Sequence, residues 1–311
     1  MTDTPSSSDY PKFKVITLLI IGLTTFGAAP ILVRYATDVE PIVLAAMRTL
    51  FAVLILLPFW LPKRKTISEL QTAGISIGMM MIAGLCLGLH FTFWIASLHY
   101  TSVASASVLV TIHPVMLIVA ESLIFKKRFK AVVWLGVIIA CTGSVILGYS
   151  DQVGGGDFEN PLLGNILAFT AAVIFVIYFM IGRKMRQKAE WIDYVFHVYL
   201  HAAIACSVLT LIWVGGWPYL SVSAVLIGLI LAAGPTVIGH GSMNYAVKYI
   251  SPTILSTLIL SEAIIAAIAA FFLFAELPTT LSIAAMLVIM TGVALSWAKR
   301  RDGIKDLKPD K

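Results

Sequence analysis

The residues suited to chemistry in this sequence are a few polar side chains set inside long apolar runs. His90, Trp94 and Ser97 follow one another at intervals of four and three residues, and His240 and Asn244 are four residues apart. On an α-helix these intervals place the side chains of each group on one face. Such faces are suited to line a binding cavity, but the same groups can also hydrogen-bond a neighbouring helix. The sequence leaves both roles open.

Glu262 is the one carboxylate deep inside an apolar run, whereas Glu121 lies nearer the end of its run. A buried glutamate can carry a proton or attract a substrate ammonium group, and it can also serve only as a helix–helix hydrogen bond. His113 is a second ionisable group at depth. Pro114 follows it, and we expect this proline to interrupt the helical hydrogen-bond ladder and free a carbonyl group.

Two tyrosines and two further histidines give weaker signals. Tyr178 and Tyr245 are candidate binding residues, although packing is a common role for tyrosine in such helices. His197 and His201 have an interval that could ligate a metal, but no third ligand is near in the sequence. We therefore expect no metal site, no catalytic residue and no cofactor. The predicted substrate-binding residues are His90, Trp94, His113, Tyr178, His240, Asn244, Tyr245 and Glu262.

These groups belong to a chain that is too apolar for an ordinary soluble protein. Of its 311 residues, 59% are hydrophobic and only 12% are charged, whereas a soluble domain is about 45–50% apolar and about 25% charged. Half the usual charge cannot cover a surface of this size. The composition predicts a polytopic membrane protein and excludes ordinary soluble enzymes and disordered chains. The three cysteines lie in apolar runs and indicate neither a disulfide nor a zinc site.

Ten apolar segments are long enough to cross a bilayer as helices, and two of them are so long that they must tilt or bend. Placing the N-terminus in the cytoplasm puts 20 of the 22 lysines and arginines on the cytoplasmic side, as the positive-inside rule requires. The two exceptions, Arg34 and Arg48, are placed beside the first external loop. The predicted segments are 15–36, 42–61, 73–98, 103–125, 131–149, 162–182, 194–214, 222–247, 252–274 and 279–298.

The ten segments divide into two sets of five around a polar linker. A shift of 149 residues aligns 98–125 with 247–274 with six identities in 28 positions, and it pairs His113 with Glu262 and Phe91 with His240. Because five is odd, the second set must insert upside down relative to the first. Inverted repeats with a site near the midplane are typical of transporters. The predicted division is a cytoplasmic tail 1–14, a repeat 15–149, an extracytoplasmic linker 150–161, a repeat 162–298 and a basic cytoplasmic tail 299–311.

Several short segments resemble one family of transporters, the EamA family of the drug/metabolite transporter (DMT) superfamily. The resemblance covers nearly the whole chain, although Ala263 stands where the family usually has proline and Lys127 where an acid is common. The segments are S-L-H-Y-T-S-V-A-S-A-S-V-L at 97–109, Y-A-V-K-Y-I-S-P-T-I-L-S at 245–256, L-A-A-M-R-T-L-F-A at 44–52, His113-Pro114-Val115, Ser261-Glu262-Ala263 and Phe274-Ala275-Glu276.

The resemblance implies an all-α integral membrane protein of ten transmembrane helices, arranged as two inverted five-helix repeats with both termini cytoplasmic. It also implies export or exchange of small metabolites, in the first place aromatic and other neutral amino acids, and within the family the chain looks most like the YddG-type exporters of aromatic and other amino acids. The inverted repeat favours a secondary transporter that works by alternating access at a midplane cavity between the repeats. Aromatic rings with histidine and asparagine suit a zwitterion with an apolar side chain. One alternative is another small metabolite, such as a purine or a drug-like cation.

Other classes of function are open but disfavoured. A channel-like pore could also use two halves. The sequence argues against an intramembrane enzyme because Gly154-Gly155-Gly156-Asp157, which has the letters of an aspartyl-protease motif, lies in the polar linker. We expect a multi-pass protein of the bacterial plasma (inner) membrane whose partners are the lipid bilayer and a small-molecule substrate, an amino acid, with no nucleic acid. One chain, a monomer, suffices for the complete ten-helix unit.

Overall fold

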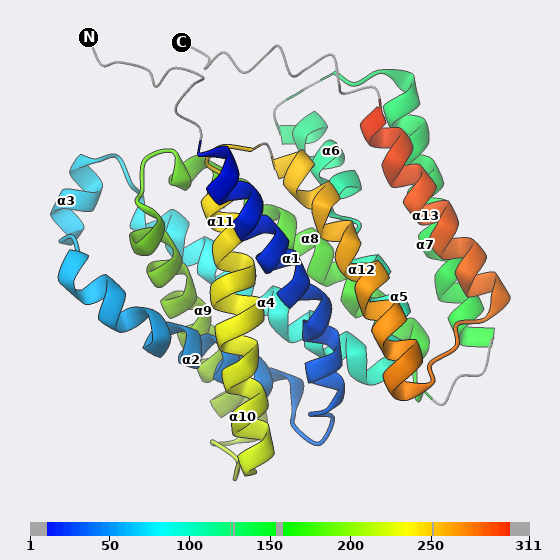
Figure 1. Cartoon of the computed structure of the whole chain (residues 1–311), viewed down its shortest axis with the longest axis horizontal. Coiled ribbons are helices and arrows are strands. Elements are labelled where there is room, and N and C mark those ends of the chain that lie inside the picture. Colours follow the sequence, from blue (N-terminus) through cyan, green and yellow to red (C-terminus); the bar gives the residue numbers. More distant parts are fainter. Residues whose placement is uncertain (1–10, 125, 127, 154–157, 251, 299–311) are drawn as a thin grey trace.

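The protein is described by a computed structural model for residues 11–124, 126, 128–153, 158–250 and 252–298, and this part of the chain is helical with no β-strand (Figure 1). Lys127, the Gly-Gly-Gly-Asp segment 154–157, residues 1–10 of the predicted N-terminal tail and the predicted C-terminal tail 299–311 lie outside the described residues. The elements are α1 Lys12–Arg34, α2 Pro41–Trp60, η1 Leu61–Lys63, α3 Ile67–Thr72, α4 Ile77–Tyr100, α5 Val103–Val110, α6 His113–Ile124, α7 Ala131–Val153, α8 Pro161–Arg186, α9 Trp191–Val214, α10 Val222–Leu231, η2 Ala232–His240, α11 Gly241–Ala246, α12 Pro252–Phe274 and α13 Thr280–Ala298.

Each of the ten predicted apolar segments overlaps one or more of these helices. Among the described residues, eight helical stretches are long and apolar enough to span a membrane, and two shorter apolar helices cover 258–274 and 280–296. Large apolar side chains such as Ile212 and Phe272 point outward with 73% and 77% of their surface exposed. A lipid environment accounts for this outer surface, which water would not favour. The chain is therefore a multi-pass membrane protein, while the number of crossings and the side of the termini stay predictions.

Two of the predicted segments are interrupted, and both interruptions lie beside the centre of the bundle. The segment 103–125 divides at Thr111 and Ile112 into α5 and α6, which confirms the interruption expected from Pro114. The segment 222–247 contains a π-helix, η2, around Pro235. There the Thr236 hydroxyl donates to the Leu231 carbonyl at 2.9 Å, five residues back. This wider turn is the form taken by the expected bend.

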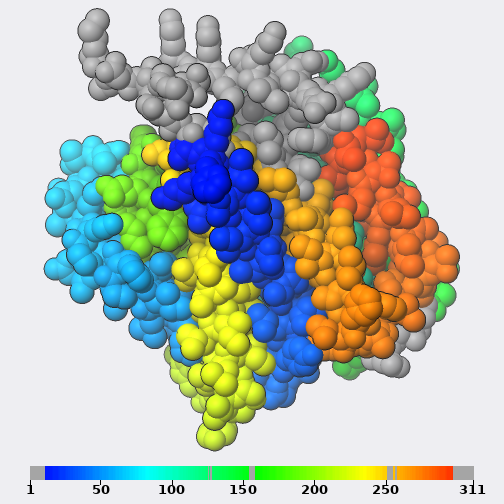
Figure 2. Space-filling model, viewed as in Figure 1, coloured from blue at the N-terminus to red at the C-terminus, as the bar shows by residue number. Residues whose placement is uncertain are grey.

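The helices pack into a bundle with a tight pair at one side. On the face shown in Figure 2, α1 lies between the α10–α11 stretch and α12. At the side, α7 and α13 run together (Figure 1). Gly136 and Gly292 make this approach possible, because a Cβ on Gly292 would lie 2.4 Å from the Ala140 nitrogen and one on Gly136 would lie 2.5 Å from the Ser296 nitrogen. Small residues are the usual means by which membrane helices approach closely.

The end of α7 differs from the expected linker. The helix continues to Val153, so the first four residues of the predicted linker are helical. Ser150 and Asp151 are hydrogen-bonded there: the Ser282 hydroxyl donates to Asp151 at 2.9 Å, and the Asn165 amide donates to it at 2.8 Å. These bonds to α13 and α8 satisfy polar groups that would otherwise favour a loop.

Candidate functional site

A small cavity lies at the centre of the bundle, and both halves of the chain line it. Its volume is about 30 Å³, which accommodates a few water molecules. Eight lining residues come from the first half and five from the second. They are Phe26, Ala29, Arg48, His90, Phe91, Trp94, Val110, His113, Phe175, Pro235, His240, Ile259 and Glu262.

Equivalent positions of the two halves meet at this cavity. The shift of 149 residues, which pairs Phe91 with His240 and His113 with Glu262, also pairs Phe26 with Phe175 and Val110 with Ile259, and all eight residues line the cavity. Phe91 and His240 are in direct contact, with ring centroids 5.0 Å apart. The cavity therefore lies where the two repeats face each other.

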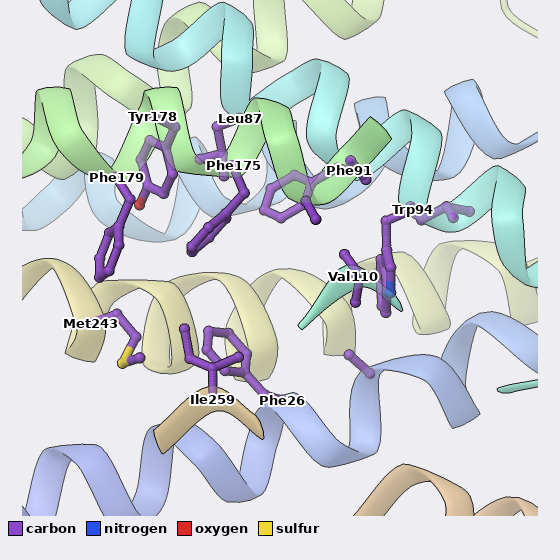
Figure 3. Packing of buried hydrophobic residues seen from close by; sticks show 14 of the residues in the cluster. Phe26, Leu87, Phe91, Trp94, Val110, Phe175, Tyr178, Phe179, Met243 and Ile259 are labelled. Carbon is purple, nitrogen blue, oxygen red and sulfur yellow. The ribbon is translucent and has the colours of Figure 1, made fainter. Parts of the chain in front are cut away.

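Aromatic and imidazole rings form most of the wall. The ring of Phe175 lies 4.2 Å from that of His113 and 5.1 Å from that of His90, centroid to centroid. The ring of Phe26 lies 4.8 Å from that of His240. Figure 3 shows Phe91 and Phe175 reaching in from one side of the bundle and Phe26 and Ile259 from the opposite side. Such a wall suits an apolar or aromatic group of a ligand.

Polar atoms without partners lie among these rings. The His90 Nδ1 is 3.0 Å from the Ala171 carbonyl. In contrast, both ring nitrogens of His113, the Nδ1 of His240 and the Nε1 of Trp94 are buried and have no hydrogen-bond partner within the described part of the chain. Buried polar groups are nearly always paired. A group of unpaired ones around a single cavity can be satisfied by water or by a polar ligand bound there.

Arg48 brings a guanidinium group to the cavity, and the sequence analysis placed it incorrectly. It lies seven residues inside α2, about 10 Å along the helix from Pro41, and it is only 1% exposed rather than beside a loop. Its Nε donates to the Thr236 hydroxyl at 3.0 Å, and its Cζ lies 3.7 Å from the centroid of the Phe91 ring. The Nη1 has no partner among the residues described.

Five of the eight predicted site residues, His90, Trp94, His113, His240 and Glu262, line the cavity.

The other three do not line it. The Tyr178 hydroxyl donates to the Asn244 Oδ1 at 2.9 Å, and the Tyr178 ring lies 6.3 Å from that of His240, so this pair forms a layer beside the cavity. Tyr245 lies away from it, against Tyr249 and beneath the Lys14 ammonium group. One residue along a helix turns a side chain by about 100°, which separates Tyr245 from the face of Asn244.

The sequence analysis missed Arg48, Phe26 and Phe175 as site residues. The signal for Arg48 was present, because the arginine stands six residues inside an apolar run of span length, where charges are rare and mark function. The signal for the two phenylalanines was their pairing under the repeat. Apolar residues at helix positions carry no further mark that separates a cavity wall from ordinary packing.

A second polar cluster, which we call the Arg34 cluster, joins the halves at one end of the bundle. Arg34 donates to the Glu276 carboxylate at 2.6 Å and 3.0 Å and also to the Leu98 and Thr101 carbonyls. The other oxygen of Glu276 accepts from the Val103 amide at 2.8 Å. This cluster ties the end of α1 and the α4–α5 turn to the connection between α12 and α13.

Comparison with known proteins agrees with this arrangement. The model of a family described as the EamA-like transporter family matches residues 13–149 and 162–298, two stretches that are themselves offset by 149 residues. The chain is 26% identical over 211 residues to the "Uncharacterized transporter YdfC" of Bacillus subtilis (strain 168), covering 64% of this chain and 63% of that protein, which is less than two thirds of its length. It is 23% identical over 267 residues to an "Uncharacterized transporter" of Clostridium kluyveri, covering 83% of this chain and 84% of that protein.

The fold is also similar to one already solved. A protein of known crystal structure superposes with a TM-score of 0.64 at 15% identity, over 96% of this chain and 99% of that one. At this level of identity the likeness shows the fold alone.

Proposed function

The chain belongs to the EamA-like transporter family, and on that premise we propose that it is a secondary transporter that exports small metabolites, in the first place amino acids. The proposed mechanism is alternating access, in which one repeat rocks against the other about the central cavity. This mechanism makes the protein a carrier rather than an enzyme. The proposed location is the bacterial plasma membrane.

The observation that carries this proposal is the position of the cavity between equivalent residues of the two halves. Four pairs of residues related by the 149-residue shift line it. A site between two inverted repeats is lined by equivalent elements of both. When the protein opens to the other side, the two repeats exchange the roles that they play around the site. A carrier needs that property, whereas an enzyme site does not.

The lining supports an amino acid as the substrate class. The phenylalanine and tryptophan rings offer a surface for an apolar side chain, while the unpaired polar atoms of Trp94, His113 and His240 offer hydrogen bonds to a charged end group. Glu262 adds an acceptor for an ammonium group. The rings would also stack on a purine, which is the second candidate substrate.

The cavity must widen to admit such a substrate, because about 30 Å³ is far less than the volume of an amino acid. The elements around it contain the two interruptions of regular helix, the α5–α6 break and the π-helix η2. Helix breaks and π-turns are places where a backbone can rearrange at low cost. They lie where an opening movement would need them.

Counterflow in proteoliposomes tests the proposal. Vesicles loaded with an unlabelled amino acid are diluted into a trace of the labelled one, with phenylalanine, leucine, threonine, adenine and a quaternary ammonium compound as the panel. We expect saturable, transient accumulation of at least one amino acid, with protein-free vesicles as the control. Accumulation of adenine alone, or of the quaternary ammonium compound alone, would instead assign a purine or a drug-like cation as the substrate class. Passive equilibration without a transient peak would indicate a channel.

A further inference from the structure

We propose that Arg48 binds the carboxylate group of the transported substrate, so that the protein selects amino acids with a free carboxylate over their amides and the matching amines. This inference rests on the proposed transport of amino acids and deepens it by naming the recognised group. In the sequence, Arg48 stood out only as one of the two basic residues that the predicted topology does not place on the cytoplasmic side. Its burial and its contacts give it a different role.

The first line of support is a buried positive charge without a carboxylate partner. Arg48 is 1% exposed, and no ion pair joins it to an acidic residue of the described chain. Glu262 lines the same cavity without pairing with it. A buried charge that no opposite charge contacts directly is costly in an apolar interior. A protein that keeps one there gains from it when an anion arrives.

The second line of support is the distribution of unpaired polar atoms. Thirteen buried side-chain nitrogen and oxygen atoms lack a hydrogen-bond partner in the described part of the chain, and five of them belong to residues of this one cavity. The Arg48 Nη1 and the Trp94 Nε1 can only donate, and the imidazoles of His113 and His240 each have a donor form. The cavity is therefore rich in donors, which is what the two oxygens of a carboxylate require.

The third line of support is that the guanidinium group is held in place. Its Nε donates to Thr236, whose own hydroxyl donates to the Leu231 carbonyl, and its Cζ lies over the Phe91 ring, 3.7 Å from the ring centroid. These contacts leave Nη1 without a partner. A guanidinium fixed by one edge and one face presents its remaining donors in the planar arrangement that matches a carboxylate.

The holding contacts also span the two repeats. Arg48 belongs to α2 in the first half, whereas Thr236 belongs to η2 in the second half. A carboxylate bound at Arg48 would therefore lie against both halves at once. Any movement of one repeat against the other would then change the contacts of the substrate carboxylate.

The test is competition in the counterflow assay between each amino acid and its amide, with phenylalanine, phenylalaninamide and phenethylamine as the first set and leucine and threonine with their amides as the others. In the wild-type protein we expect the amide and the amine to compete roughly 10- to 100-fold more weakly than the acid, the range for a hydrogen bond to a charged group. Arg48→Met should lower counterflow of the acid by a similar factor and abolish its advantage over the amide. Arg48→Lys should restore part of that advantage.

The matched control is Lys65→Met, which removes an exposed lysine outside the cavity and should leave the acid-to-amide ratio unchanged. Equal loss of acid and amide in Arg48→Met would assign the arginine a structural role and overturn the inference. Wild-type protein that does not distinguish acid from amide would overturn it while leaving amino-acid transport intact, and this result does not depend on how the variants fold. Absence of counterflow for all three amino acids would overturn both proposals.

Discussion

Arg34 and Arg48, the two basic residues that the charge sorting left over, are buried in opposite ways. Arg34 is joined to Glu276 and to two backbone carbonyls in the Arg34 cluster. Arg48 is buried more deeply, has one hydrogen bond to a neutral hydroxyl and lies on an aromatic ring, with Nη1 unpartnered among the described residues. Both charges sit in regions where charge is costly.

The difference in hydrogen bonding indicates a structural role for Arg34 and supports the ligand-binding role proposed for Arg48. A network whose members satisfy one another stabilises a particular packing of helices. A hydrogen-bond network with unpaired members is less stable than a complete one. In a native protein, buried polar atoms without partners therefore need an explanation. The Arg34 cluster therefore joins the two halves at one end of the bundle, while ligand binding is the role that we propose for the Arg48 side of the cavity.

The largest effect on stability should come from breaking the Arg34 cluster. Arg34→Met leaves Glu276 partly buried without its cation, which costs about 3 kcal/mol. Arg48→Met removes an unpaired charge and should change stability by less than about 1 kcal/mol. Thermal unfolding of both variants in the same detergent makes the comparison, and Arg34→Met combined with Glu276→Met should recover part of the loss. Equal destabilisation by the two single variants would contradict the distinction drawn here.

The next effect concerns the donors at the cavity. Trp94→Ala should lower counterflow by roughly tenfold, because it removes a wall and an unpaired N–H group from the site. His90→Ala should act in the same direction. Protein in the membrane should remain at its normal level, as measured by immunoblot. Trp213→Ala is the matched control, since that side chain is 81% exposed on α9. Unchanged transport in both cavity variants would reduce these residues to packing.

A smaller effect is expected at Glu262. Glu262→Gln keeps the shape of the side chain and an acceptor oxygen but removes the charge, so counterflow should survive within about fivefold. Few ionisable groups are available in the described spans to relay protons, and we therefore expect transport down the substrate's own gradient. An imposed pH gradient should drive no accumulation in either protein. Uphill uptake in the wild type that disappears in Glu262→Gln would show that transport is coupled to protons.

The smallest effect should come from an exposed ion pair, which completes the series. Lys65 and Glu190 are 2.8 Å apart at the surface, and the hydrogen bond from Lys65 lowers the pKa of Glu190. A lowered carboxyl pKa stabilises the fold above the ordinary pKa, and that contribution is lost as the pH falls through the lowered value. Glu190→Gln should therefore cost at most about 0.5 kcal/mol at pH 7 and nothing at low pH, as followed by thermal unfolding. A larger loss of unfolding free energy would mean that exposed ion pairs stabilise this protein more than we expect from the contrast with the buried Arg34 cluster.

Sequence reasoning predicted the helical segments well and the site in part, for physical reasons. Apolar runs of span length are strong signals, and Pro114 marked a real interruption. The ends of the predicted segment 42–61 differ from those of α2 by only one residue. Arg48 was missed because the charge sorting assigned it to the loop, although it stands six residues inside that segment, where a charge marks function. Tyr245 was grouped with Asn244 by proximity in the sequence, although adjacent helix residues face different directions. The π-turn around Pro235 was expected only as a bend, from the length of the segment, although the proline inside the apolar run was a further signal of interrupted helix.

The glycine contact between α7 and α13 has a consequence for how the halves could move. These helices end the first and second repeats, and their backbones approach so closely that Gly136 and Gly292 cannot be enlarged without pushing them apart. None of the residues lining the cavity belongs to either helix. In a rocking motion the two repeats would then rotate about an axis at this helix pair, and the cavity would lie at a distance from that axis. A rotation too small to disturb the glycine contact would translate into a much larger displacement at the cavity.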